Sequence, residues 1–370
     1  MSLLDQITGG AGGLSPRAVI LRLCAIGAVT AASASGFAYA GGWLSPGRLT
    51  PERMIDGFQE VNGVHPGFRR NHAKGLCVEG RFESSGAAAG LTRVRMLAPG
   101  VVLPITGRVA LAVGTPDAAD AAGTVRSLAL RVRLADGEEW RTGMNSLPVF
   151  LVRTPEAFYE QILAGKPDPA TGKPDPARMK AFFAAHPESV RAAALINART
   201  ITSGFADSTY ASLNAYRFVA ADGTETPVRW AMVPERAPVA QGAADAGRAD
   251  PNYLFDDLEA ELRRAPLRWR LVVTLGRPGD PTADATLPWP SDRKTVDAGT
   301  LVLTGTAAEG PGNCRDVNFD PLVLPDGIAP SDDPLLSARS AAYSQSFTRR
   351  AGEPKSPSPV KDPPVQGAAL

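Results

Sequence analysis

The sequence has little of several features that mark common classes of protein. Its 370 residues include only three cysteines and three histidines, and the formal net charge is +1. A nearly neutral chain lacks the basic surface that binds nucleic acid, so no nucleic-acid partner is expected. No glycine-rich phosphate loop follows a strand with an acidic residue downstream, which argues against a nicotinamide site. No repeat of 20–50 residues indicates a solenoid.

The three cysteines set narrow limits on disulfide and metal chemistry. Cys24 lies in an apolar N-terminal segment, which leaves Cys77 and Cys314 as one possible pair. Their spacing matches no metal-binding pattern. Free cysteines are commonly buried as small apolar residues, so we expect Cys77 and Cys314 to be unpaired, with a disulfide as the alternative.

The N-terminal segment has the features of an export signal. Arg17 and Arg22 precede an uncharged run over residues 23–44, which contains the small-x-small pattern Ala-Tyr-Ala at residues 38–40. We expect residues 1–44 to be a signal cleaved after Ala40. An uncleaved membrane anchor is the alternative, because about 20 uncharged residues can span a bilayer. Positive charge before the run predicts that the remainder lies outside the cytoplasm, in a periplasm.

The order of the expected elements indicates an α+β domain built around an antiparallel barrel. Alternating apolar patterns predict strands over residues 77–82, 91–97, 107–113, 128–134, 211–220, 226–234 and 269–276. Helical patterns with caps predict helices over residues 49–59, 154–163, 178–186, 187–196, 254–265 and 335–350. The proline-, lysine- and serine-rich residues 352–370 are expected to be a disordered tail.

The helix expected over residues 335–350 has an unusual face. Steps of four and seven residues bring Arg339, Tyr343 and Arg350 to one side of it. A neighbouring guanidinium favours the phenolate form of a tyrosine. A phenolate is a good axial ligand for ferric haem. The alternative is an ordinary amphipathic helix with two surface arginines.

A second segment resembles the distal-side signature of haem catalases. Residues 68–75 read Phe-Arg-Arg-Asn-His-Ala-Lys-Gly, with Arg69 three residues before His72. Further segments similar to the catalase family follow in the family's order, at residues 124–140, 143–150, 209–218, 228–230 and 318–335. The resemblance implies a catalase-like fold over residues 45–351: an eight-stranded antiparallel β-barrel with flanking helices that binds haem b. The chain ends soon after the tyrosine helix. It is therefore expected to lack the C-terminal helical domain of full-length catalases and resembles the small, exported catalase-related peroxidases.

On the distal side, the resemblance implies that His72 is the acid and base and that Asn145 hydrogen-bonds to peroxide. Without the resemblance, His72 would be interpreted as a polar loop residue and Asn145 as a turn residue. The chain departs from the family at three positions: Asn71 stands for a valine, Ala110 for a serine that hydrogen-bonds to the histidine, and Met144 for a glycine. We expect the first two changes to favour peroxidase turnover over disproportionation of hydrogen peroxide.

On the proximal side, the resemblance implies that Tyr343 is the axial ligand of the iron and that Arg339 keeps it ionised. The remaining candidates are the propionate-binding arginines Arg69, Arg108 and Arg350, and the pocket walls Phe150 and Phe158. The alternatives for these five are surface charge and ordinary core packing.

The expected function is that of a haem-dependent peroxidase, a monomer or homodimer, which reduces hydrogen peroxide or organic hydroperoxides and oxidises a small organic donor. Two alternatives keep the haem. One is isomerisation or dehydration of fatty-acid hydroperoxides, and the other is a haem-binding module without catalysis.

Overall fold

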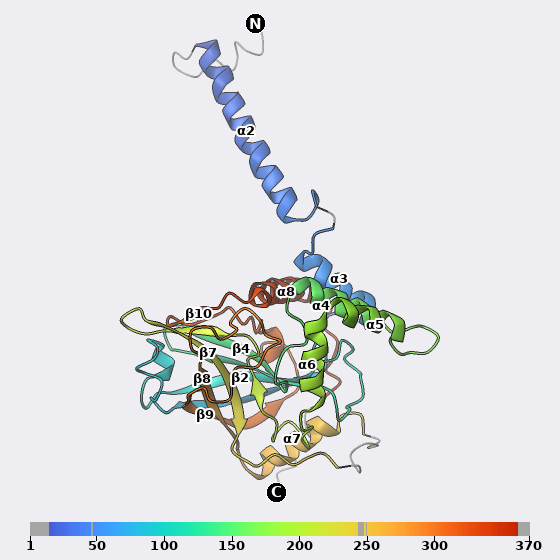
Figure 1. Ribbon diagram of the computed structural model, residues 1–370, viewed down its shortest axis with the longest axis vertical. Helices are drawn as coiled ribbons and strands as arrows, with labels where there is room; N and C mark the ends of the chain where they lie inside the picture. The colour runs from blue at the N-terminus through green and yellow to red at the C-terminus, as the bar shows by residue number, and fades with distance from the viewer. Residues whose placement is uncertain (1–14, 46, 243–247, 249, 362–370) are drawn as a thin grey trace, which may run out of the picture. The chain divides into compact units, whose positions relative to one another are not determined.

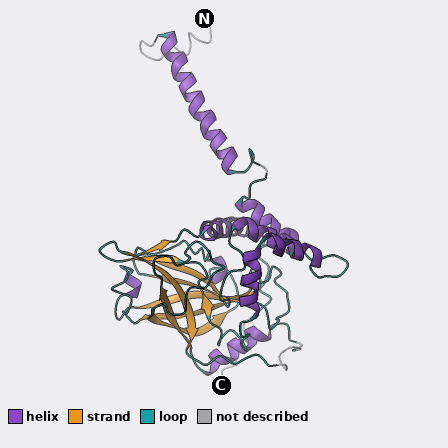
Figure 2. Cartoon of the chain, in the orientation of Figure 1, coloured by secondary structure: helices purple, strands orange, loops and turns teal. Residues whose placement is uncertain are grey.

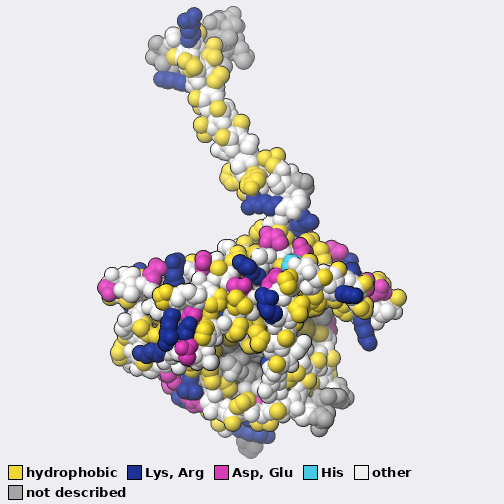
Figure 3. All heavy atoms as spheres, in the orientation of Figure 1, with side chains coloured by type: hydrophobic (Ala, Val, Ile, Leu, Met, Phe, Trp, Pro, Cys, Tyr) yellow, Lys and Arg dark blue, Asp and Glu magenta, His cyan; other side chains and the backbone are white. Residues whose placement is uncertain are grey.

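The computed structural model of the protein describes residues 15–45, 47–242, 248 and 250–361. The chain divides into two compact units, Met1–Arg53 and Met54–Leu370. The described part of the first unit consists mainly of helix α2, Pro16–Ala40, which starts at an N-cap, Ser15, whose hydroxyl accepts a hydrogen bond from the amide of Ala18. Apolar side chains are exposed along this helix (Figure 3). It is long and apolar enough to cross a membrane and is compatible with either a signal peptide or an anchor.

The second unit is built on a closed barrel (Figures 1 and 2). Its strands are β1 Gly75–Ser84, β2 Val102–Leu111, β3 Arg126–Arg133, β4 Glu139–Asn145, β5 Tyr210–Ala211, β6 Tyr216–Val219, β7 Glu225–Pro234, β8 Leu267–Leu275, β9 Thr295–Ala307 and β10 Ile328–Pro330. The order β7-β5-β4-β3-β2-β1-β9-β8 closes on itself because β7 also pairs with β8. The predicted eight-stranded antiparallel barrel is therefore confirmed, and β6 and β10 extend the sheet from β7.

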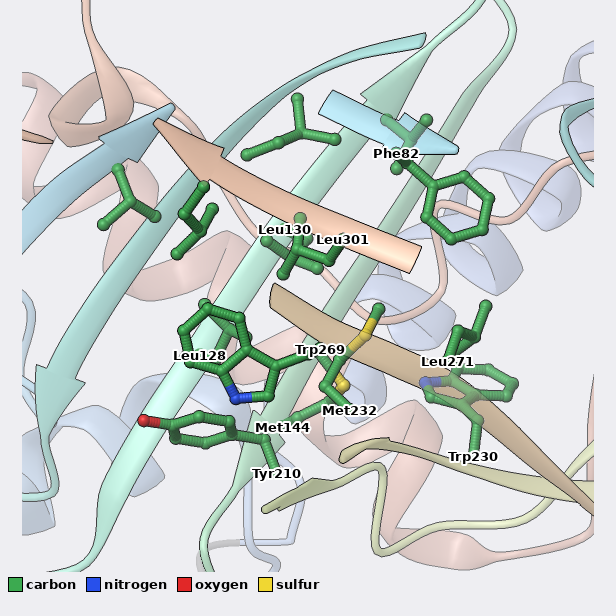
Figure 4. Packing of buried hydrophobic residues seen from close by; sticks show 14 of the residues in the cluster. Phe82, Leu128, Leu130, Met144, Tyr210, Trp230, Met232, Trp269, Leu271 and Leu301 are labelled. Carbon is green, nitrogen blue, oxygen red and sulfur yellow. The ribbon is translucent and has the colours of Figure 1, made fainter. Parts of the chain in front are cut away.

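Alternation along the strands separates the packed interior of the barrel from its outer face. Leu76, Val109, Leu128 and Met144 are register partners across β1 to β4, and all four are buried in the main core cluster. Figure 4 shows this interior, where Trp269 and the Leu128 and Met144 side chains converge. Because successive side chains point to opposite faces, the residues between these positions face outward.

Helices surround the barrel, and most begin where the sequence signals predict. They are α3 Pro51–Asn62, α4 Pro155–Ala164, α5 Pro176–Ala185, α6 Pro187–Asn197, α7 Tyr253–Arg264 and α8 Pro334–Ala351. Thr154, Asp175 and Asp333 cap α4, α5 and α8, each followed by a proline at the first helical position. Figure 1 shows α4 and α8 together beyond one side of the barrel and α7 at the other end.

Two of the predicted strands are wrong, and three strands of the structure were not predicted. Residues 91–97, predicted as a strand, end in the 3₁₀ turn η1, Arg95–Leu97, because a short buried apolar run does not by itself specify a strand. The strand predicted over residues 211–220 is divided into β5 and β6, and Leu213 between them has a positive φ of 62°. Strands β4, β9 and β10 were not predicted. In β9, glycines and polar residues interrupt the apolar pattern.

The C-terminal segment also differs from expectation. Residues 352–361 pack on the domain instead of being disordered, and residues 362–370 lie outside the described residues. Val360 joins the main core cluster, and Glu353 forms an ion pair with Arg70. The composition of this segment indicated disorder, but one apolar side chain and one carboxylate find partners on the barrel.

Cys77 and Cys314 form a disulfide, so the expectation of two unpaired thiols is wrong. The two residues are 237 positions apart in sequence, yet their Cα atoms lie 5.5 Å apart. Cys77 is near the start of β1, and Cys314 opens the 3₁₀ turn η3, Cys314–Asp316. Only the folded barrel brings these two segments together.

Replacing both Cys77 and Cys314 by serine is expected to lower the free energy of unfolding by about 2–5 kcal/mol, because the disulfide restricts the unfolded chain. Denaturant titration of the wild type and the double variant, each with and without reductant, measures this. Cys24→Ser is the control. A double variant as stable as the oxidised wild type would show that the bond does not contribute to stability.

Candidate active site

The candidate residues from β2, β3 and β4 stand in two neighbouring rows on the outer face of the barrel. Ala110, Ser127 and Asn145 are register partners, so their side chains lie side by side. Two residues along, Arg108, Ala129 and Gly143 form the second row. A cavity of about 180 Å³ lies against these rows and is closed by side chains of α8, α3 and α4.

All nine residues singled out from the sequence line this one cavity. They are His72, Asn145, Arg69, Arg108, Phe150, Phe158, Arg339, Tyr343 and Arg350. Strands β2 and β4 supply Arg108 and Asn145, and helices α4 and α8 supply Phe158 and the three residues 339, 343 and 350. The others lie in loops. The fold therefore brings together residues that are up to 281 positions apart (69 to 350).

His72 is held in an uncommon backbone conformation. Its φ is +55°, a left-handed value that non-glycine residues seldom adopt. The side-chain oxygen of Asn71 accepts a hydrogen bond from the His72 amide at 2.9 Å. Asn71, which stands where the family has valine, thus stabilises the turn that directs the imidazole.

A serine holds the imidazole of His72, but it comes from an unexpected strand. Ser127 Oγ lies 3.1 Å from Nδ1 of His72 and donates a hydrogen bond to the Ala110 carbonyl at 3.3 Å. A hydroxyl has a single proton. If the hydroxyl gives that proton to the Ala110 carbonyl, Nδ1 of His72 is the donor to Oγ and Nε2 carries no proton. Ser127 thus fills the role that the family resemblance assigns to the position of Ala110.

The electrostatics of the cavity keep His72 neutral. Burial, followed by the positive charges of Arg108, Arg339 and Arg69, lowers the pKa of His72 to about 3. A neutral imidazole with an unprotonated Nε2 can accept a proton at physiological pH.

Asn145 lines the cavity beside Ser127, its register partner. Met144, which replaces a family glycine, is buried in the barrel core. Because adjacent residues of a strand face opposite sides, the larger side chain is accommodated in the interior and Asn145 keeps its outward direction.

Helix α8 contributes Tyr343 and Arg339, which both line the cavity and interact electrostatically. Arg339 also donates to the Gly143 carbonyl at 3.1 Å. A Cβ atom on Gly143 would lie 3.3 Å from the Tyr343 hydroxyl, so glycine lets this hydroxyl approach β4 closely. Burial alone would lower the pKa of Arg339, but interaction with Tyr343 and Tyr216 raises it, so the guanidinium stays charged beside the phenol.

Sequence reasoning missed the residues that orient Arg339. Asn214 accepts a hydrogen bond from Arg339 through Oδ1, and its Nδ2 donates to Asp333 at 2.7 Å. Asp333 is also the N-cap of α8. The sequence signal for Asp333 as a cap, before Pro334, was readable. Nothing local distinguishes Asn214, because its role depends on the break between β5 and β6.

The predicted arginines of the cavity are paired with protein groups. Arg69 binds Glu309 at 2.8 Å, and Arg108 binds the same carboxylate through Nε at 3.0 Å and Nη2 at 2.8 Å. Arg350 donates to the Arg315 carbonyl. A Cβ on Gly75 would overlap the Arg108 guanidinium, which accounts for the glycine in the Ala-Lys-Gly motif. Glu309 was not anticipated, because it lies in a loop with no motif.

Apolar side chains complete the cavity. Phe150 and Phe158 lie with ring centroids 5.6 Å apart, and Phe58 of α3 meets Phe158 edge-on at 5.9 Å. Met54 and Ile55 also line the cavity. The lining thus combines aromatic and aliphatic surface with a histidine, a tyrosine and several arginines, a mixture suited to a large, flat, anionic ligand.

Comparisons with solved structures agree with the fold. Catalase A from Saccharomyces cerevisiae superposes with a TM-score of 0.69 at 20% identity, covering 81% of this chain and 64% of that one. A bacterial catalase gives a TM-score of 0.69 at 20% identity, covering 78% and 58%. The chain spans about three fifths of the length of these two structures, and at this identity they bear on the fold alone.

Sequence comparisons extend over most of the chain. It is 36% identical over 302 residues to a catalase-related peroxidase of Synechococcus elongatus, covering 82% of this chain and 89% of that protein. It is 34% identical over 307 residues to a catalase-related peroxidase of Mycolicibacterium paratuberculosis, covering 83% and 96%. A family model described as catalase matches residues 52–369. With its closed barrel, its tyrosine helix and these matches, the chain belongs to the catalase family.

Proposed function

We propose that this protein is a haem-dependent peroxidase that reduces hydrogen peroxide or an organic hydroperoxide and oxidises a small organic donor. The observation that carries the proposal is the meeting, in one cavity, of a neutral histidine and an arginine-supported tyrosine. The family and its relatives named catalase-related peroxidases support the same activity.

The residues of the cavity fit haem b. Tyr343 offers an anionic oxygen for the iron, with Arg339 beside it to stabilise the phenolate. Arg69, Arg108 and Arg350 offer cations for the propionates. Phe150 and Phe158 offer apolar surface for the ring. Bound in this cavity, haem would supply the redox-active iron that accepts oxidising equivalents from peroxide.

The distal residues of the chain would manage the proton. His72 takes a proton from the incoming peroxide at Nε2 and returns it to the leaving oxygen, so that one group acts as base and then as acid. Ser127 fixes the tautomer that makes this possible, through Nδ1. Asn145 can hydrogen-bond to the peroxide without adding charge, which helps to orient it.

Replacing Ser127 by alanine is expected to slow the reaction with peroxide by about tenfold, as the loss of other outer-shell partners does. The imidazole would then be free to rotate and to change tautomer. Adding Ala110→Ser to Ser127→Ala should restore the rate, because the two positions are register partners. Stopped-flow spectroscopy with hydrogen peroxide measures both variants. Equal rates in wild type and Ser127→Ala would show that this hydroxyl is not needed.

The pKa of His72, lowered to about 3, predicts how the stability of the haem-free protein depends on pH. Between pH 6.5 and 3 the unfolded chain binds a proton at this residue that the folded chain does not. Stability should therefore fall as the pH falls through this window and stay unaffected above it. From pH 7.5 to 5 the contribution is roughly 2 kcal/mol. Urea unfolding at both pH values should show a smaller loss in His72→Asn than in the wild type. An equal loss would mean that folded His72 titrates normally.

The test of the proposed function begins with the purified protein and its optical spectrum. We expect a high-spin ferric haem spectrum, and turnover of hydrogen peroxide or cumene hydroperoxide with a phenolic donor. Product analysis with a lipid hydroperoxide and no donor separates peroxidase activity from isomerisation. A folded protein that takes up no haem, or that binds haem without reacting with any peroxide, would contradict the proposal.

We also propose that the domain works in the periplasm, after export through a cleaved signal or on an N-terminal anchor. Support comes from the apolar helix α2 and from the disulfide, since disulfides persist mainly in oxidising compartments. Cell fractionation with mass analysis of the N-terminus would test location and cleavage together. Recovery of the full chain in the soluble cytoplasmic fraction would contradict export.

A further inference from the structure

Glu309 is a buried carboxylate that contacts two of the cavity arginines at once. Its two oxygens accept hydrogen bonds from Arg69 at 2.8 Å and from Arg108 at 3.0 and 2.8 Å. Both guanidiniums line the cavity, and Glu309 contacts them from outside its lining. Glu309 is 8% exposed and Arg108 is 3% exposed, so little water screens these ion pairs.

The hydrogen-bonding capacity of the two guanidiniums is largely used. Arg108 turns one forked edge, Nε and Nη2, to the Glu309 carboxylate, which is the edge that binds a carboxylate bidentately. Arg69 gives Nη2 to the carbonyls of Cys314 and Val317 at 3.1 and 3.0 Å, in addition to its bond to Glu309. An incoming carboxylate finds only the remaining N–H groups.

Glu309 is ionised in this setting. Burial would raise the pKa of its carboxyl, but the charges of Arg108 and Arg69 outweigh burial and lower it. Arg350 adds to this effect from α8. The three arginines therefore already have one full negative charge among them before any ligand arrives.

We propose that Glu309 is an internal counter-ion that competes with the haem propionates for Arg69 and Arg108, and so limits how tightly the cavity holds haem. This inference rests on the proposed function, because it concerns the same haem site. In this inference Glu309 lowers the affinity for haem, whereas a residue that only positions the arginines would raise it. If Glu309 positions them, its loss weakens haem binding; if it competes, its loss strengthens it.

The direct test replaces Glu309 by glutamine, which keeps the shape and one acceptor oxygen and removes the charge. Haem dissociation is measured by transfer from the haem-loaded protein to excess apomyoglobin. We expect Glu309→Gln to release haem at least about tenfold more slowly than the wild type, while the haem-free variant unfolds at lower denaturant concentration. Unchanged or faster release would overturn the inference.

The matched control is Glu139→Gln. Glu139 is also largely buried and is also bonded to two arginines, Arg133 and Arg141, but neither Glu139 nor these arginines line the cavity. Its haem release should equal that of the wild type. Slower release in both variants would show a general effect of lost negative charge and would also overturn the assignment to Glu309.

A measurement on the wild type covers the case in which Glu309→Gln does not fold. The dimethyl ester of haem b has no propionate charge. If Glu309 already satisfies the arginines, the ester should dissociate less than about tenfold faster than haem b. Dissociation more than about a hundredfold faster would show that the propionates are the dominant partners of the arginines, and would overturn the inference. A wild type that takes up no haem contradicts the proposed function itself, and is thereby distinguished from failure of this inference alone.

Discussion

Replacing Tyr343 by phenylalanine is expected to remove most of the haem from the purified protein. The phenol of Tyr343 is the proposed axial ligand of the iron, and the Arg339 guanidinium lines the same cavity. Loss of the ligand itself should cost more than the about 10–100-fold in metal affinity that loss of an outer-shell partner costs. The measurement is the haem-to-protein ratio, with the optical spectrum of whatever haem remains.

Tyr253→Phe is the control for this substitution, since Tyr253 is a buried tyrosine of α7 that does not line the cavity. It should retain wild-type haem content. A Tyr343→Phe protein with full haem content and an unchanged spectrum would show that another residue binds the iron, and the assignment of the proximal side would be wrong.

Replacing His72 by asparagine is expected to leave haem bound and to slow the reaction with peroxide by about 10²–10⁴-fold, the usual contribution of a general acid–base group. Asparagine suits this position because it tolerates the left-handed backbone found at residue 72. The substitution therefore removes the titratable nitrogen and disturbs the turn little. Stopped-flow rates with hydrogen peroxide, at matched haem content, measure the effect.

His186→Asn serves as the control, because His186 lies between α5 and α6 and is paired with Glu160. A His72→Asn protein that reacts as fast as the wild type would remove the catalytic role of the histidine. If neither the wild type nor His72→Asn reacts with any peroxide, the protein would be a haem-binding module without catalysis.

Individual strands and helix starts were predictable because their signals are local, whereas the closed eight-stranded barrel was expected from the family resemblance. Alternation in residues 128–134 and 226–234 follows directly from a sheet with one buried face, and the caps at Thr154 and Asp333 mark helix starts. Helical spacing singled out Arg339, Tyr343 and Arg350, the family resemblance supplied the other candidates, and all of them line the cavity. What could not be predicted are partners fixed by the folded arrangement. Ser127 depends on strand register, Asn214 on a break between strands, and Glu309 on the loop after β9, which brings its carboxylate to Arg69 and Arg108.

The disulfide is a further case of information that is not local. Nothing near Cys77 or Cys314 in the sequence marks a partner, and the spacing of 237 residues carries no motif. The proximity arises only when η3 docks beside the start of β1. The disulfide belongs to a small apolar cluster with Val317 and Phe319, and this cluster packs against Tyr343. The bond therefore also stabilises the surface on which the proposed axial ligand rests.

Because Ala110 and Ser127 face each other across β2 and β3, a hydroxyl lost from one strand can be supplied by the other without any change in the barrel interior. The two positions are 17 residues apart in the chain. Inspection of the sequence just after Arg108 therefore finds Ala110 and misses the Ser127 hydroxyl that lies beside the imidazole. If Ala110→Ser restores the rate lost in Ser127→Ala, a serine at either position serves the histidine, and the two positions should be scored together when relatives are compared.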